Sequence, residues 1–413
     1  MELTIHRGTK EIGGTVVELN TDNTRLLIDL GMPLSKNSTE IDIGNLKPDA
    51  VLVSHPHQDH FGLIDQLDCE VPVYIGELSK DLIFATHKFL DRPLPDNNFF
   101  HFKNWQPFKI GDFRITPYLV DHSAVDAYGF LVEAEGKRVF YSGDFRASGN
   151  KAFLFDKLLD DPPSSIDMLL MEGTMMRRNS DRFPDEVSVR RRIEKILRNQ
   201  QNITFMIASS QNIDRLVSAV HACQTAAKIL VIDFYTAWVL EKVKQVSAKV
   251  PNIDWETVKV YADRTMDDRI KHDPGFFGDF RGRLYQHRVT NDELASDPAR
   301  YLSYSKMSRF RIMELYKKFS PINLIYSQWL GYLKLQNDVY YGAEEISAYQ
   351  NDPQVNFTYA HTSGHATLDT LHKMVAALRP ARLVPIHTEY PDDFTNHFDG
   401  VTILKDGQSL TIS

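Results

Sequence analysis

The 413-residue chain has little cysteine and no long hydrophobic run. Its only two cysteines, Cys69 and Cys223, are too few for a disulfide framework, and this favours a reducing compartment. No apolar run approaches the roughly 18 residues that a membrane-spanning helix needs. The first residues, MELTIHRGTK, do not have the pattern of a signal peptide. We therefore expect a cytoplasmic protein that does not interact with membranes.

The sequence also lacks an excess of positive charge. Lysine and arginine number 47 against 55 aspartates and glutamates, which gives a net charge of −8. This excludes a uniformly basic protein that coats nucleic acid, so binding of a polyanion would need local basic patches or metal ions. Hydrophobic residues make up 42% and charged residues 25%, as is typical of soluble globular proteins.

The order of expected strands and helices predicts an α/β fold. Short strands dominate residues 1–175 and return after residue 350, whereas helices and strands alternate between these sections. Helices are predicted over about 78–90 and 185–198, and the stretch 265–320 reads as irregular and charged up to a helix around 305–319. We predict one discontinuous domain, residues 1–175 with 351–413, interrupted by a doubly wound α/β insert over 176–350.

A histidine-rich loop is the strongest chemical signal. His55, His57, Asp59 and His60 lie in the segment SHPHQDH, directly after the apolar strand VLVS. Imidazole and carboxylate groups are ligands for zinc and similar divalent ions. In a looped segment, His55 and His57 can face one position while Asp59 and His60 reach a second one nearby. This spacing therefore favours two neighbouring metal ions.

Further ligands are expected at the ends of other strands. His122 follows an apolar strand in DHS, Asp144 ends another in YSGD, and His387 ends a third in PIH. A carboxylate has two oxygens, so Asp144 is suited to bridge two ions. Asp29 ends the strand LLID, where it either orients a ligand histidine or caps a turn.

This combination of HPHQDH with Asp29, His122 and Asp144 resembles the metallo-β-lactamase superfamily. Three segments are similar to motifs A, B and C of the β-CASP nucleases: LLMEGT, in which Glu172 ends a strand, HTSGHAT with His365, and VPIHTEY with His387. The segments GTKEIGG and ASSQNIDRL most resemble ribonuclease J proteins. The resemblance implies an αββα sandwich that carries an inserted β-CASP cap over 176–350.

The resemblance also implies a role for each site residue. Two zinc ions are expected, with manganese or magnesium as alternatives. The ligands would be His55, His57 and His122 for the first ion, and Asp59, His60 and His387 for the second, with Asp144 bridging. The catalytic residues would be Asp59, His365 and Glu172, where His365 protonates the leaving oxygen and Glu172 orients its ring.

Five hydroxyl and amide residues are candidates for binding a substrate phosphate. Ser363 and Thr367 flank His365, and Ser209, Ser210 and Asn212 precede an expected helix in the insert. Helix N-termini bind anions, but such residues also cap helices. Both interpretations of these residues stay open.

The leading functional expectation is a zinc-dependent ribonuclease that hydrolyses single-stranded RNA, as an endonuclease, a 5′–3′ exonuclease or both. The histidine of motif C favours RNA over DNA, because this resemblance associates His387 with the RNA-cutting branches. Two alternatives remain: a small-molecule hydrolase of lactamase or thioesterase type, and a binding subunit without activity. A homodimer is also compatible with the sequence.

Overall fold

The computed structural model describes residues 1–35, 38–178, 183–261, 264–305, 313–314, 316–319, 321–333 and 343–413. The chain divides into two compact units, the first comprising Met1–Phe84, Leu94–Ser180 and Gly364–Ser413, the second Ala85–Pro93 and Asp181–Ser363. The sequence had predicted boundaries after residues 175 and 350. Among the described helices, none has both the length and the apolar character that a membrane crossing requires.

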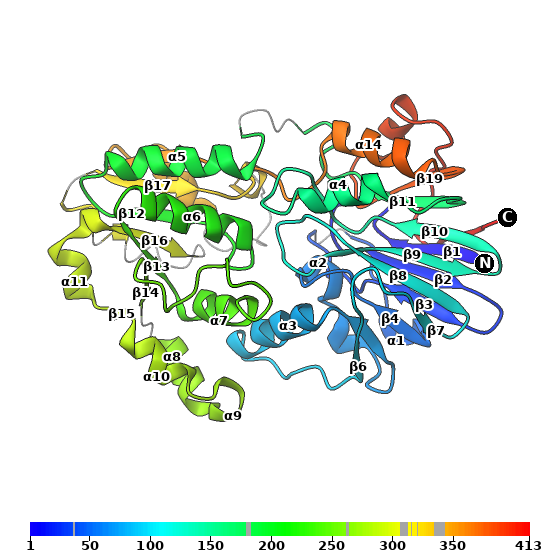
Figure 1. Cartoon of the computed structure of the whole chain (residues 1–413), viewed down its shortest axis with the longest axis horizontal. Helices are drawn as coiled ribbons and strands as arrows, with labels where there is room; N and C mark the ends of the chain where they lie inside the picture. Colours follow the sequence, from blue (N-terminus) through cyan, green and yellow to red (C-terminus); the bar gives the residue numbers. More distant parts are fainter. Residues whose placement is uncertain are drawn as a thin grey trace. The chain divides into compact units, whose positions relative to one another are not determined.

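The first unit contains two mixed sheets (Figure 1). In spatial order, one sheet consists of β20 (Gln408–Thr411), β1 (Glu2–Arg7), β2 (Val16–Asn20), β3 (Arg25–Ile28), β4 (Ala50–Leu52), β5 (Val73–Ile75) and β6 (Phe99–His101). Pairing is antiparallel from β20 to β3 and parallel from β3 to β6. Three parallel pairs place the carboxyl ends of β3 and β4 at one edge, where the histidine-rich loop begins.

The other sheet brings distant parts of the chain together. Its strands, in spatial order, are β19 (Arg382–Ile386), β11 (Met168–Glu172), β10 (Lys137–Tyr141), β9 (Tyr128–Ala134), β8 (Phe113–Leu119) and β7 (Phe108–Ile110). Strand β11 pairs in parallel with both β10 and β19. The three predicted strand-end segments that follow β10, β11 and β19 therefore leave the same edge of this sheet.

Helices cover the outer faces of both sheets, while apolar side chains fill the space between them. Leu26, Phe130 and Met168 belong to the cluster between the sheets. Helices α1 (Ile43–Leu46), α2 (Gln58–Phe61) and α3 (Glu77–Phe89) contribute to a cluster on the first sheet, and α4 (Phe153–Asp160) and α14 (Leu368–Leu378) to one on the second (Figure 1). Short 3-10 turns lie at Ile64–Gln66 and Pro391–Asn396. The predicted αββα sandwich is confirmed.

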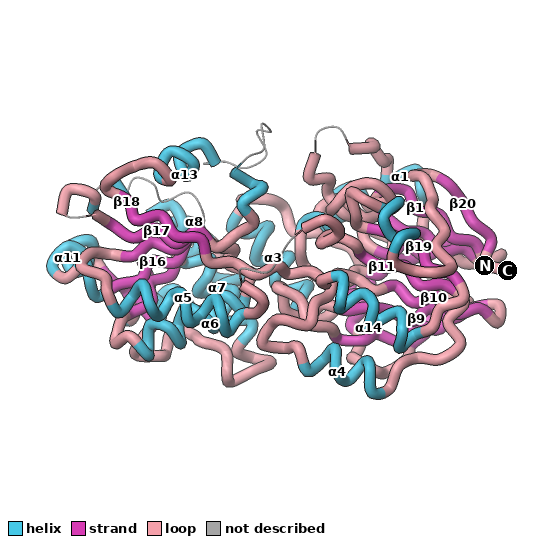
Figure 2. The backbone as a smooth tube through the Cα atoms, turned by 90° about the horizontal axis from the view of Figure 1, so that it is seen from above, coloured by secondary structure: helices cyan, strands magenta, loops and turns pink. Residues whose placement is uncertain are grey.

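The second unit combines helices with strands of a single sheet (Figure 2). Its sheet has the order β15 (Arg288–Val289), β14 (Val258–Tyr261), β13 (Ile229–Ile232), β16 (Tyr301–Ser305), β12 (Thr204–Ile207), β17 (Ile322–Tyr326) and β18 (Val355–Tyr359). All these strand pairs are parallel. The described helices are α5 (Glu186–Arg198), α6 (Ile213–Thr225), α7 (Phe234–Val243), α8 (Arg264–His272), α9 (Pro274–Phe277), α10 (Phe280–Gln286), α11 (Asn291–Ser296) and α13 (Ala343–Tyr349), with 3-10 turns at Pro298–Arg300 and Leu330–Leu333.

A buried ion pair joins α5 to α6 in this unit. The side chains of Arg215 and Glu186 are 0% and 1% exposed. Two parallel hydrogen bonds connect them, from Nε to Oε2 at 3.1 Å and from Nη2 to Oε1 at 3.0 Å. Arg215 also donates to the carbonyl of Ser327, which follows β17, at 3.0 Å. Each charge is thus compensated inside the unit, and removal of either partner would leave the other buried alone.

Candidate metal centre

The histidine-rich loop runs from the end of β4 into α2. His57 takes the extended conformation of a helix N-cap and Asp59 lies in the first turn. Asp29, which follows β3, accepts hydrogen bonds from the backbone N–H of Ser54 at 2.7 Å and from its hydroxyl at 2.8 Å. It also accepts one from Nδ1 of His60 at 2.7 Å. Asp29 therefore contacts a predicted ligand and also holds the backbone of the loop.

The structure brings three predicted ligands together as one group: His55, His57 and His122. Nδ1 of His57 lies 3.1 Å from Nε2 of His55 and 3.2 Å from Nε2 of His122. Burial lowers the pKa of His55 and His122 well below the ordinary value, and lowers the pKa of His57 to about 4. All three rings are neutral at pH 7, so their lone pairs are available to a cation.

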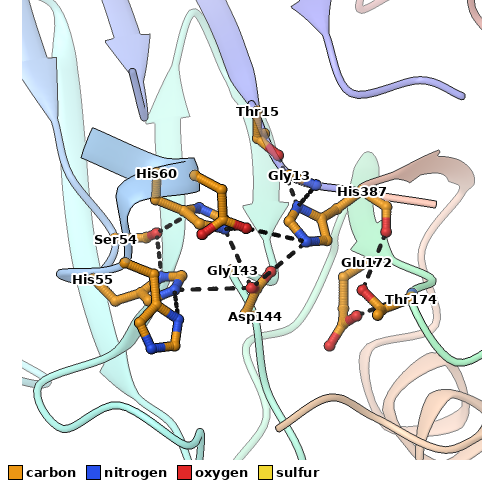
Figure 3. A network of polar contacts seen from close by, with 12 residues as sticks. Gly13, Thr15, Ser54, His55, His60, Gly143, Asp144, Glu172, Thr174 and His387 are labelled. Carbon is orange, nitrogen blue, oxygen red and sulfur yellow. Dashed lines mark hydrogen bonds and ion pairs between the residues drawn. The ribbon is translucent and has the colours of Figure 1, made fainter. Parts of the chain in front are cut away.

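A second group consists of Asp59, His60, Asp144 and His387, whose donor atoms lie within 4.8 Å of one another. Nε2 of His60 lies 3.2 Å from Oδ2 of Asp144, and Nε2 of His387 lies 3.8 Å from the same oxygen (Figure 3). Within the described part of the chain, these two Nε2 atoms are buried without a hydrogen-bond partner. Buried nitrogens that converge on carboxylates without hydrogen bonds fit a divalent cation.

Asp144 lies between the two groups. Its Oδ2 is 3.8 Å from Nε2 of His55 in the first group and also close to both histidines of the second. Burial disfavours the charged carboxylate, but the imidazoles of His387 and His60 outweigh this and hold the pKa of Asp144 well below its usual value. An ionised carboxylate in this position has the geometry to be shared by two cations.

The turn that carries Asp144 requires glycine. Gly143 has φ +56°, and a Cβ atom at this position would lie 2.4 Å from the carbonyl oxygen of Tyr128. The backbone of β9 therefore packs directly against the turn that follows β10. Replacement of this glycine would displace the segment that ends in Asp144.

His387 is held from several directions. It has φ 48°, a conformation that is uncommon for a residue with a side chain. Its backbone N–H donates to the carbonyl of Gly8 at 2.7 Å, and its Nδ1 lies 2.9 Å from Oγ1 of Thr15 (Figure 3). The N-terminal segment from Gly8 to Thr15 thus contacts both the backbone and the ring of the last predicted ligand.

The structure also brings His365 and Glu172 together. Nδ1 of His365 lies 3.2 Å from Oε1 and 3.1 Å from Oε2 of Glu172, and 3.7 Å from Oδ2 of Asp144. Burial alone would lower the pKa of His365, but the two carboxylates outweigh it and raise this pKa to about 8. The backbone N–H of Ala366 donates to Glu172 at 3.2 Å, so the carboxylate has a fixed orientation.

The predicted phosphate-binding residues are divided between the two units. Thr367 belongs to the first unit, whereas the other four, Ser363, Ser209, Ser210 and Asn212, belong to the second. Thr367 caps α14 by accepting from the N–H of Thr370. Asn212 caps α6 in the same way, through the N–H of Arg215. Ser210 is fully buried and accepts from the hydroxyl of Thr236 at 2.9 Å. Phosphate binding by these residues stays a prediction.

Sequence reasoning missed two residues that contact the predicted site, one at the ligand His122 and one at Asp29. The carbonyl of Gly364 accepts from Nδ1 of His122 at 2.6 Å, which leaves Nε2 of that ring with its lone pair. The hydroxyl of Tyr141 donates to Asp29 at 2.6 Å. Tyr141 stands three residues before Asp144, a position that could have drawn attention to it. The carbonyl of Gly364 carries no signal in the sequence.

Comparisons with known proteins identify a matching family and several relatives. Residues 12–180 match the family model of the metallo-beta-lactamase superfamily. Ribonuclease J of Mycoplasma genitalium is 22% identical over 408 residues, covering 93% of this chain and 67% of that protein. Ribonuclease J of Helicobacter pylori strain 26695 is 23% identical over 413 residues, covering 93% of this chain and 55% of that protein.

A solved structure shares the fold over the whole chain. This structure of a protein of unknown function from Enterococcus faecalis V583 has a TM-score of 0.75, is 19% identical, and covers 99% of both chains. At that identity the likeness supports the fold alone. Residues 12–180 thus match the metallo-beta-lactamase superfamily, and the chain as a whole is similar to ribonuclease J proteins.

Proposed function

We propose that the chain is a metal-dependent ribonuclease that hydrolyses RNA phosphodiester bonds at a centre of two cations. The main support is the convergence of His55, His57, Asp59, His60, His122, Asp144 and His387 into two adjoining groups that share Asp144. Similarity to ribonuclease J over 93% of the chain adds the substrate class. When bound, such cations would lower the pKa of water and stabilise charge on a phosphoryl group.

A different set of residues would hold each of these cations. The neutral rings of His55, His57 and His122 would hold the first, while Asp59, His60 and His387 would hold the second. Asp144 would bridge them, because its Oδ2 is 3.8 Å from ring nitrogens on both sides. Zinc suits this set of nitrogen and oxygen donors, with manganese and magnesium as alternatives.

His365 is the proposed proton donor to the leaving 3′ oxygen. Its Nδ1 lies 3.7 Å from Oδ2 of Asp144, one of the proposed ligands, and 3.1 Å from Oε2 of Glu172. Contact with both oxygens of Glu172 fixes the ring plane, so that Nε2 faces away from the carboxylate. Glu172 thereby acts as a positioning residue for a general acid.

The proposed substrate is single-stranded RNA, cut internally, from a 5′ end, or both ways. Thr367 and Ser363 would contact a phosphate beside His365, and Ser209, Ser210 and Asn212 would form a further phosphate contact in the second unit. These roles rest on the residue types and on the N-termini of α14 and α6.

Cleavage of end-labelled RNA tests the proposal. Purified protein is stripped of metal, supplied with zinc, manganese or magnesium, and incubated with 5′-monophosphorylated and 5′-triphosphorylated RNA. We expect cation-dependent cleavage, with product sizes that separate internal cutting from stepwise removal of 5′ nucleotides. Turnover of a β-lactam or thioester with no RNA cleavage would instead identify a small-molecule hydrolase.

A further inference from the structure

The two loops that carry His122 and Asp144 are joined by a buried ion pair that no role above explains. Asp121 directly precedes His122, and Arg146 follows Asp144 by two residues. Both side chains of the pair are 0% exposed, and Nε of Arg146 lies 3.4 Å from Oδ1 of Asp121. All four residues belong to the first unit. A charged pair without solvent contact therefore lies beside one ligand from each group.

Backbone contacts lock the two loops at the same place. The N–H of Arg146 donates to the carbonyl of Asp121 at 2.7 Å, and the two residues form an isolated antiparallel bridge. The N–H of Gly149 donates to Oδ2 of Asp121 at 2.7 Å. Nζ of Lys151 donates to the carbonyl of His122 at 3.0 Å. The segment after Asp144 thus donates hydrogen bonds both to the residue before His122 and to the carbonyl of His122 itself.

Stability alone is a weak reason for such a pair. Burying two charges removes them from water, and apolar side chains of similar size often stabilise a protein as well or better. What an ion pair does provide is a defined distance and direction between the segments that it joins. Here those segments present a nitrogen of the first group and the carboxylate that lies between the groups.

We propose that Asp121 and Arg146 are positioning residues that set the spacing between His122 and Asp144 and thereby allow two cations to be held together. This inference rests on the metal centre of the proposed function and assigns a task to residues outside its ligand set. Loss of the pair would let the two loops move apart, and cation binding would weaken although every ligand remains.

Three variants test this proposal. Arg146→Met removes one charge and leaves Asp121 with Lys151, whose Nζ lies 3.8 Å from Oδ1 of Asp121. The double substitution Asp121→Asn with Arg146→Gln removes both charges of the pair and serves if the single variant fails to fold. Arg146→Lys keeps the positive charge. Arg114→Met is the matched control, because Arg114 pairs with Glu133 at 2.6 Å in the same unit but is 52% exposed.

The readouts are cation content by mass spectrometry, cation affinity by chelator competition, and the rise in unfolding temperature on adding zinc or manganese to metal-free protein. We expect Arg146→Met and the double variant to lose about 10- to 100-fold in affinity, as when outer partners of metal ligands are removed. In these two variants, added zinc or manganese should also raise the unfolding temperature much less than in the parent protein. Arg146→Lys should recover part of both, and the control should match the parent protein.

Unchanged cation content and affinity in the folded double variant would overturn the inference, even if its metal-free form unfolds at a lower temperature. That result would make the pair a purely structural feature and leave the proposed function intact. A parent protein that retains no cation would overturn the metal centre itself and the inference with it.

Discussion

At the scale of single residues, burial and charge divide the histidines of the centre into two kinds. His55, His57 and His122 are buried among other rings, and burial lowers their pKa, to about 4 for His57. Burial also opposes protonation of His60, but the carboxylates of Asp144 and Asp29 outweigh it and raise its pKa well above the ordinary value. The first three rings would therefore hold the proposed cation at neutral pH without losing a proton, whereas His60 would first have to give one up.

Asp144→Asn tests the carboxylate between the two groups. The amide is neutral and similar in size, so the fold and RNA binding should persist while cation binding is lost. We expect cleavage to fall by more than the about 10- to 100-fold typical of outer-partner substitutions. Labelled-RNA cleavage, RNA binding by fluorescence anisotropy and cation content are the measurements. Asp161→Asn, at an exposed carboxylate of the same unit, should behave like the parent protein. Full cleavage by Asp144→Asn would contradict the ligand assignment.

Gly143→Ala should displace Asp144 while keeping its carboxylate side chain. The added methyl would lie 2.4 Å from the carbonyl oxygen of Tyr128, and the positive φ costs a side chain about 1–3 kcal/mol in addition. Gly136→Ala is the matched control, since Gly136 has φ +72° at the other end of β10 with no atom within 4 Å of its Cβ position. We expect only Gly143→Ala to lower cation content, and equal cation content in both variants would contradict this.

The sequence carries a signal for the candidate ligands but none for the ion pair beside them. His55, His57 and His60 stand out because their spacing in one loop is specific to metal chemistry. Asp121 and Arg146 were missed because an ion pair between residues 25 apart in the chain leaves no local pattern. Such pairs emerge only when β8 and β10 are placed in one sheet.

At the scale of elements, local patterns predicted the amphipathic helices and missed a central strand. Helices expected over 78–90 and 185–198 are α3 (Glu77–Phe89) and α5 (Glu186–Arg198), the latter with a capping box formed by Asp185 and Ser188. The expectation of irregular structure over 265–320 was wrong for its described part, which contains α8, α9, α10, α11, β15 and β16. Strand β16 has the sequence YLSYS and lies between β13 and β12 in the sheet. Its two serines are buried, so the sequence lacks the apolar run by which a central strand is recognised.

The contact between α8 and α10 should depend on pH. Arg281 donates to both oxygens of Asp267, at 2.7 and 2.9 Å, and these hydrogen bonds lower the pKa of Asp267. A lowered pKa means that the stabilisation is present above the unfolded value of about 3.9 and is lost as pH falls through and below it. Asp267→Asn should therefore cost about 0.5–1 kcal/mol at pH 7 and almost nothing at low pH.

Denaturant unfolding of the parent and Asp267→Asn between pH 7 and pH 3 measures this difference. Asp268→Asn is the control, because Asp268 is an exposed residue on the same helix. A stability difference between parent and Asp267→Asn that stays constant down to pH 3 would show that the pair does not act through the charge of Asp267.

At the scale of the whole molecule, the chain has two units with separate cores. One core lies between and around the two sheets of the sandwich, and the other packs on the parallel sheet of the second unit. The proposed ligands all belong to the first unit, while the buried pair of Arg215 and Glu186 belongs to the second. The two units should therefore respond to different perturbations.

Arg215→Met should destabilise the second unit selectively. It leaves Glu186 charged and buried, a change that costs about 3–5 kcal/mol. We expect calorimetry or denaturant unfolding to show two transitions, of which Arg215→Met lowers one and cation removal lowers the other. A variant with Glu186→Gln added to Arg215→Met should regain part of the loss. A single transition shifted by both treatments would show that the units unfold together.

The position of His387 on the sequence has a consequence for synthesis. Strand β19 inserts beside β11 only after residue 386 has been made, and His387 follows directly. A chain that is still being synthesised thus lacks one member of the second donor group until residue 387 has been translated. If the centre cuts RNA, the nascent chain cannot cut the message that encodes it before His387 has left the ribosome and β19 has paired with β11.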